Sequence, residues 1–219
     1  MAMVPAALVA VLLLSTPVTV DRVAVRFYSP ETGGADHPLF VLERRLAFEA
    51  RLEAMGDGRT GYDDRDVASA MDRDIAEQIL VGLAHKLIDE SPADKRPDLR
   101  DLVKVEQDVA AGMVARFGGR PAVDAAAAGE QIDPSEVDTL LTRAGLAAWY
   151  IDRSITSLLH PDEEQLREVY RTGGHPYRGQ PFETVRQQLE QWYVVERARA
   201  AENAYVQSAR SHAHVVIVR

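Results

Sequence analysis

The sequence predicts a mostly α-helical protein with a small two-stranded β-sheet. A long C-terminal helix is predicted over residues 181–213, because apolar side chains recur there at steps of three and four, the spacing of one helical face. β-Branched residues gather at residues 22–28 and again at residues 214–218, which predicts two strands. Since a single strand needs a partner, we expect these two to pair and to join the ends of the chain. The alternative is a frayed C-terminal tail.

The long helix has the features of a central element. Pro181 suits a first helical position, where its missing N–H has no helical partner to lose, and Glu183 places negative charge at the positive end of the helix dipole. At about 1.5 Å per residue the helix is roughly 45 Å long, more than the width of a small domain. We therefore expect other parts of the chain to pack along its apolar positions, which are Phe182, Val185, Leu189, Trp192, Val195, Ala198 and Tyr205.

Six shorter helices are predicted between the strands, at residues 40–55, 63–90, 98–117, 123–128, 133–159 and 161–172. The second has the clearest period, with apolar residues at steps of four: Val67, Met71, Ile75, Ile79, Leu83 and Leu87. The fifth opens with an Asp cap, a proline and a glutamate at Asp133, Pro134 and Glu136, a combination typical of helix starts.

Loops are predicted where glycine and proline are dense. These are residues 29–38, after the first strand, and residues 175–179, before the long helix. Glycine pairs at residues 118–119 and 173–174 fit helix ends better than phosphate-binding loops.

The bulk composition excludes several classes of function. The chain has 219 residues, a formal charge of −9 and a pI near 5.2, so its surface repels phosphate backbones and nucleic acid is not an expected partner. It has no cysteine, which excludes disulfides, thiolate metal ligands and a cysteine nucleophile. A hydrophobic content of 46% suffices for a sizeable core and argues against global disorder.

The first 19 residues are predicted to be a signal peptide. Residues 1–14 are almost entirely apolar and are followed by small residues and a proline, as in a secretory sequence. The run is too short to span a membrane comfortably, so no stable membrane span is expected once it is removed. The signal is atypical, since no Lys or Arg precedes the apolar run and no A-x-A site precedes Asp21. A buried N-terminal helix or strand is the alternative.

Four stretches, in order, carry a resemblance to a known family. They are Val20–Val25 (VDRVAV), Arg116–Gly119 with the alanine-rich helix and the DPSEVDTLLTR segment after it, Trp149–Arg153 leading to Pro161–Tyr170, and Pro181–Arg186 with its long helix and closing strand. In this order the chain resembles the peptide-binding chaperone domain of the SurA/PrsA group of exported foldases, whose fold is shared with the C-terminal region of trigger factor. The resemblance implies one such domain over residues 20–219 and a periplasmic location.

Two departures from that family bear on function. Many members carry a parvulin-type prolyl isomerase domain just before the last helix, but residues 172–180 leave room only for a short turn. The resemblance therefore implies the chaperone part without the isomerase. The loop at residues 29–38 is also longer and richer in glycine than the usual link between first strand and first helix.

No catalytic residue, metal ligand or cofactor site is predicted. His212 and His214 are predicted to share a face at the start of the last strand, but two ligands make an incomplete metal site. His37, His160 and His175 each precede a proline and are expected to shape turns. The acidic pairs at residues 63–64 and 163–164 fall in first helical turns, where the helix dipole explains them. Nucleophile motifs and glycine-rich phosphate loops are absent from the sequence.

We therefore expect an exported, non-catalytic chaperone that shields apolar segments of unfolded clients such as outer-membrane proteins. The residues that line its peptide-binding groove are not identified by the sequence. Core packing is the favoured role of the aromatic pairs at residues 149–150 and 192–193, with a groove wall as the alternative; Met71 and Met113 are candidates for an adaptable groove surface. One alternative function is a dedicated structural or assembly partner, including a homodimer that exchanges the long helix; a prolyl isomerase is less favoured.

Overall fold

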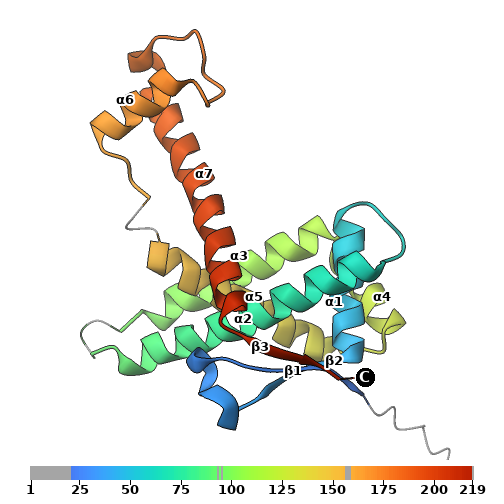
Figure 1. Ribbon diagram of the computed structural model, residues 1–219. Helices are drawn as coiled ribbons and strands as arrows, with labels where there is room; N and C mark the ends of the chain where they lie inside the picture. Colours follow the sequence, from blue (N-terminus) through green and yellow to red (C-terminus); the bar gives the residue numbers. More distant parts are fainter. Residues whose placement is uncertain (1–20, 93, 95, 156–158, 219) are drawn as a thin grey trace, which may run out of the picture.

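The computed structural model describes residues 21–92, 94, 96–155 and 159–218 (Figure 1). The predicted signal peptide at residues 1–19 lies outside this range. Seven helices and three strands follow one another as β1 (Val23–Tyr28), β2 (Leu39–Leu42), α1 (Glu43–Gly56), α2 (Asp64–Glu90), α3 (Leu99–Arg116), α4 (Arg120–Gly129), α5 (Pro134–Ile155), α6 (Glu163–Thr172), α7 (Phe182–Ser211) and β3 (His214–Ile217). The described chain is thus mostly helical with a small sheet, which confirms the predicted fold class.

The two ends of the described chain pair as expected. β3 lies antiparallel to β1, with Arg26 opposite Val216 and Val25 opposite Ile217. The sheet has a third strand that was not predicted, because β2 pairs with the other edge of β1 and gives the order β2-β1-β3. Two short 3₁₀ turns, Pro30–Thr32 and Gly34–Asp36, connect β1 to β2 within the predicted loop.

The prediction of a helix from residue 40 is therefore wrong at its start. Phe40 is 46% exposed whereas Val41 is fully buried, the alternation of a strand rather than a helix. Residues 39–42 form a strand because their backbone pairs with β1, a partner that the local sequence does not predict. The helix begins only at Glu43. The other helix boundaries agree with the predictions to within about four residues, and Pro181 caps α7 instead of opening it.

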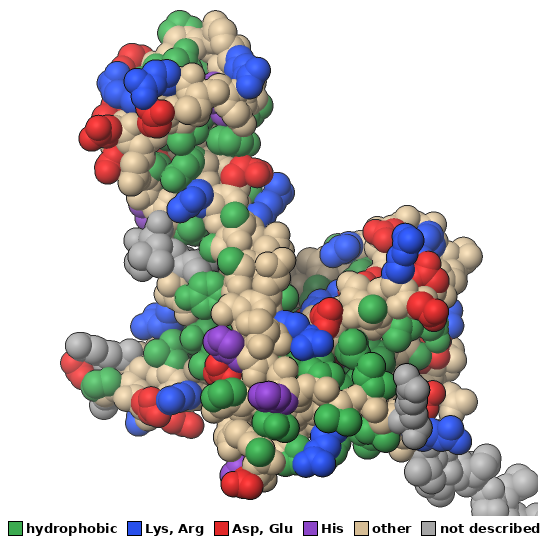
Figure 2. All heavy atoms as spheres, in the orientation of Figure 1, with side chains coloured by type: hydrophobic (Ala, Val, Ile, Leu, Met, Phe, Trp, Pro, Cys, Tyr) green, Lys and Arg blue, Asp and Glu red, His purple; other side chains and the backbone are tan. Residues whose placement is uncertain are grey.

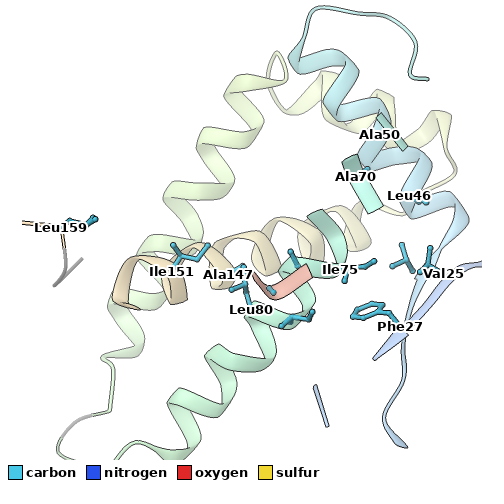
Figure 3. Close-up of a cluster of buried hydrophobic side chains, with 14 residues drawn as sticks. Val25, Phe27, Leu46, Ala50, Ala70, Ile75, Leu80, Ala147, Ile151 and Leu159 are labelled. Carbon is cyan, nitrogen blue, oxygen red and sulfur yellow. The ribbon is translucent and has the colours of Figure 1, made fainter. Parts of the chain in front are cut away.

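The main core lies between the sheet and α2. Val25 and Phe27 point from β1 toward Ile75 and Leu80 of α2 (Figure 3), and Ala147 and Ile151 of α5 complete the cluster. A second cluster joins α1, α4 and α5 around Phe48, Phe117, Val123, Val137 and Leu141. These two clusters form the body of the molecule.

The long helix α7 has two sets of partners along its length. Its C-terminal part packs on the main core through side chains that include Val194, Ala198, Ala201, Tyr205 and Ala209. Its N-terminal part stands away from the body and carries α6 beside it (Figure 1). The expectation that other segments pack along this helix is confirmed, and the two sets of contacts define an arm, by which we mean residues 162–193.

Candidate functional site

The tip of the arm has a hydrophobic core of its own. Leu166 of α6 and Val185 and Leu189 of α7 are almost fully buried, although they lie far from the body. Asp162 starts α6 by accepting a hydrogen bond from the Gln165 N–H at 2.7 Å, and Gln165 returns one from its side chain. The Arg167 guanidinium lies 4.6 Å from the centre of the Phe182 ring. The tip is therefore a packed unit.

His175 closes the turn between α6 and α7. Its ring is buried, Nε2 donates to the Tyr170 carbonyl at 3.1 Å, and Nδ1 accepts from the Tyr177 N–H at 3.1 Å. The ring also stacks on Tyr170, with centroids 5.3 Å apart, and meets the edge of Trp192. Since both ring nitrogens are used by the backbone, His175 is a structural residue, in agreement with the predicted role in a turn.

A groove runs between α6 and α7 on this arm. Its volume is about 600 Å³, and it is lined by Asp162, Glu164, Gln165, Glu168, Val169 and Tyr193. Three of the lining residues are acidic and none is basic, while Val169 and Tyr193 supply apolar surface. The pair at residues 192–193 is thus divided, with Trp192 against the buried His175 and Tyr193 on the groove wall. Packing against a buried residue, the favoured prediction for this pair, therefore applies to Trp192, and the alternative of a groove wall applies to Tyr193.

Apolar surface continues beyond the groove. Val195 of α7 is 48% exposed, two residues after Tyr193 of the groove. Figure 2 shows an open concavity between the arm and the body, with hydrophobic side chains along the arm and on the body below it. The lining of the groove therefore combines acidic and apolar side chains, and exposed arginines lie elsewhere on α6 and α7.

The other aromatic pair and the two methionines belong to the body. Trp149 is buried in a cluster with Leu146 and Ala84, and Tyr150 packs partly buried against it. Met71 packs against the main core and Met113 against the second cluster. Neither methionine lines the groove on the arm, because both pack against the clusters of the body.

A buried network of charges lies between α1, α2 and α5. Arg143 of α5 contacts Glu49 at 2.9 Å, Asp74 at 2.5 Å and Glu77 at 3.1 Å, while Arg45 of α1 also pairs with Asp74. Burial raises the pKa of Glu49 well above its usual value and raises that of Asp74, and it raises the pKa of Glu77 to about 7. Sequence reasoning missed this network.

This network has a structural role. Its carboxylates are engaged by arginines, and the adjoining apolar cavity of about 30 Å³ holds no more than a water molecule. A sequence signal for the network exists in Asp74, which is fully buried and lies one turn after the buried Ala70, beside the apolar row of α2. Acidic residues at core spacing indicate buried ion pairs.

The histidines of the C-terminal segment do not form a metal site. His212 caps the end of α7 instead of starting the strand, and its Nδ1 lies 2.8 Å from Glu31 Oε1. His214 begins β3, and its ring stacks on Tyr28 at 4.9 Å. The expectation that both share one strand face is wrong, because His212 belongs to the end of α7 and the strand begins only at His214. Across the part of the chain that the structure describes, no group of three or more potential ligands could hold a metal ion.

Comparisons with known proteins give no family assignment. No protein-family model, curated protein or solved structure matches the chain. Among the described residues, none of the helices has both the length and the hydrophobicity that crossing a membrane requires.

Proposed function

We propose that this protein is an exported, periplasmic, non-catalytic chaperone that binds extended apolar segments of unfolded proteins on its arm. The observation that carries this proposal is the groove of about 600 Å³ between α6 and α7, which lies on an arm that stands away from the body. Clients would bury apolar side chains against Val169 and Tyr193, with a gain of roughly 25 cal/mol per Å² of apolar surface removed from water.

The negative charge of the groove favours clients that carry basic residues. Asp162, Glu164 and Glu168 line it; Glu168 pairs with Arg171, so Asp162 and Glu164 supply its negative charge. Segments that combine apolar residues with Lys or Arg are therefore the favoured clients, and their binding weakens as salt rises because exposed charges are screened. Such contacts are individually weak and tolerate many sequences, as a holding chaperone requires.

Aggregation of chemically unfolded citrate synthase, followed by light scattering, tests this function. We expect the full chain to suppress aggregation and Tyr193→Asp or Val195→Asp to weaken suppression at least several-fold. Leu99→Asp is the matched control, because Leu99 is also an exposed helical apolar residue, at 63%, but lies on α3 of the body. Absence of suppression by the unmodified protein at several-fold molar excess would refute the proposal.

Two other functions remain as outcomes of related tests. A dedicated assembly partner would be recovered with one stoichiometric protein and would not suppress aggregation of general clients. A prolyl isomerase would accelerate proline-limited refolding, which the proposal does not expect, since nine residues connect α6 to α7. Export itself is tested by N-terminal sequencing of the mature protein, where we expect a start near residue 20.

A further inference from the structure

The strand β3 lies at an edge of the sheet and has one partner. Within the described residues it pairs with β1 alone, and the sheet order β2-β1-β3 leaves its other side without a strand. The Val218 N–H donates to the Ala24 carbonyl at 2.9 Å, in register with the ladder. Because successive residues of a strand direct their backbone groups to opposite sides, Val215 and Ile217 direct their N–H and C=O groups to the open edge.

The side chains at this edge are apolar and accessible. Val216, Ile217 and Val218 are 56%, 63% and 47% exposed. Hydrophobic side chains gather around β3 in Figure 2. Residues 214–218 contain no Lys, Pro or acidic residue, the usual means by which proteins protect an edge strand from pairing.

The opposite edge of the sheet differs. In β2 the central Val41 is fully buried, Phe40 is the one large apolar residue with high exposure, and the register with β1 shifts between Val23 and Val25. The strand runs directly into α1 at Glu43, which limits its accessible length. The open, apolar edge is thus a property of β3.

We propose that the free edge of β3 is a second client-binding site, which adds an extended apolar segment of an unfolded protein as a fourth strand. This inference rests on the proposed chaperone function and specifies how a client backbone is recognised. The N–H and C=O groups of Val215 and Ile217 offer four main-chain hydrogen bonds, which do not depend on client sequence. The exposed valine and isoleucine side chains favour β-branched and aromatic client residues.

A second copy of the chain fits this edge less well than a client segment. β3 has four residues, whereas stable interfaces use roughly 20–30 residues a side. Main-chain pairing over so short an edge gives the weak, reversible binding that a client needs. The edge contact alone is too small for a lasting dimer.

Ile217→Pro tests the proposal with minimal damage to the fold. Proline removes the Ile217 N–H, which faces the open edge and takes no part in the ladder with β1. The probe is a fluorescein-labelled peptide of alternating valine and threonine, about ten residues long, with lysine at both ends. We expect Ile217→Pro to weaken its affinity for the full chain by about tenfold, while Phe40→Pro, the matched change on the edge of β2, leaves affinity unchanged.

A modified peptide provides a test that leaves the protein unaltered. N-methylation of alternate residues along one peptide edge blocks strand addition, and we expect it to abolish binding to the unmodified chain. Equal affinity of the methylated and unmethylated peptides, or of Ile217→Pro and the unmodified protein, would overturn the proposal.

Failure of this inference is distinguishable from failure of the proposed function. If the unmodified protein suppresses aggregation but Ile217→Pro binds the peptide normally, the edge site is refuted and the arm remains. If suppression is absent but peptide binding depends on Ile217, the chaperone function is refuted and the edge site is supported. A dimer in sedimentation analysis that Ile217→Pro dissociates would assign the edge to a second copy and overturn the client proposal.

Discussion

Asp74 and Glu49 are carboxylates placed inside the protein, at 0% and 5% exposure, where a lone charge is very costly. Arg143 and Arg45 approach them from α5 and α1, so the buried charges are paired across three helices. Such a network fixes the relative position of the helices, because moving one helix would separate a buried carboxylate from its arginine. Removing one arginine has the same effect and leaves an uncompensated buried carboxylate. The network adds less stability than its number of contacts suggests, since each group loses its hydration.

Glu77 of this network predicts a pH dependence of stability. Its pKa in the folded protein is about 7, raised from 4.5 chiefly by burial, so the protonated form is favoured by folding. This contribution is fully present below pH 4.5 and is lost as pH rises through 7, because the folded state then binds more protons than the unfolded state. We expect the free energy of unfolding, measured in urea, to fall between about pH 5 and pH 8.

Glu77→Gln isolates this effect, since glutamine keeps the shape of the protonated side chain without titrating. We expect the variant to lose a substantial part of the decrease between pH 5 and pH 8, with Glu49 and Asp74 supplying the remainder through their own raised pKa values. An unchanged pH slope in the variant would contradict the assignment to Glu77.

At the scale of the elements, close packing of α3 on α5 depends on one glycine. A Cβ atom on Gly145 would lie 2.6 Å from the Glu106 Cα, a backbone atom that moves only if the whole helix moves. Gly112, on α3, has no neighbouring atom within 4 Å of its own Cβ position. The two glycines therefore have different roles although both lie inside helices.

Gly145→Ala is expected to destabilise the protein by about 1–3 kcal/mol, because α3 must shift away from α5. Gly112→Ala, the matched control, is expected to stabilise it by about 0.5–1 kcal/mol, since alanine has the higher helix propensity and no clash arises. Urea unfolding of both variants measures the difference. Stabilisation by both substitutions would show that the two helices are not in such close contact.

At the scale of the whole molecule, the sheet joins the first described strand to the last. Between them lie the helices of the body and an arm whose tip has a separate core. The register of β1 and β3 therefore determines where α7 leaves the body and, through α7, where the groove lies. A change in this pairing would move the arm.

A disulfide across this pairing tests it directly. Arg26 and Val216 lie opposite each other and are both exposed, and cross-strand pairs have the Cα separation that a disulfide requires. We expect Arg26→Cys with Val216→Cys to oxidise readily in a chain without other cysteines, and to stabilise it by about 2–4 kcal/mol through closure of a long loop. Thiol titration and urea unfolding with and without reductant measure both effects.

Arg26→Cys with Val215→Cys is the control for the disulfide. Val215 lies opposite Phe27, so its side chain and that of Arg26 point to opposite faces of the sheet. We expect its thiols to remain free. Equal oxidation of both pairs would contradict the register.

The sequence by itself determined the helices and the two terminal strands, because helical period, capping residues and β-branched runs are local properties that neighbouring residues enforce. The caps at Asp63 and Asp162 and the row from Val67 to Leu87 are examples. Only the tertiary structure decided the rest. It made residues 39–42 a strand, since their hydrogen-bond partners lie in β1, and it placed the groove and the ion network, whose residues meet from helices far apart in sequence. Such contacts depend on packing and burial over the whole chain, and a local pattern such as the core spacing of Asp74 does not identify the partners.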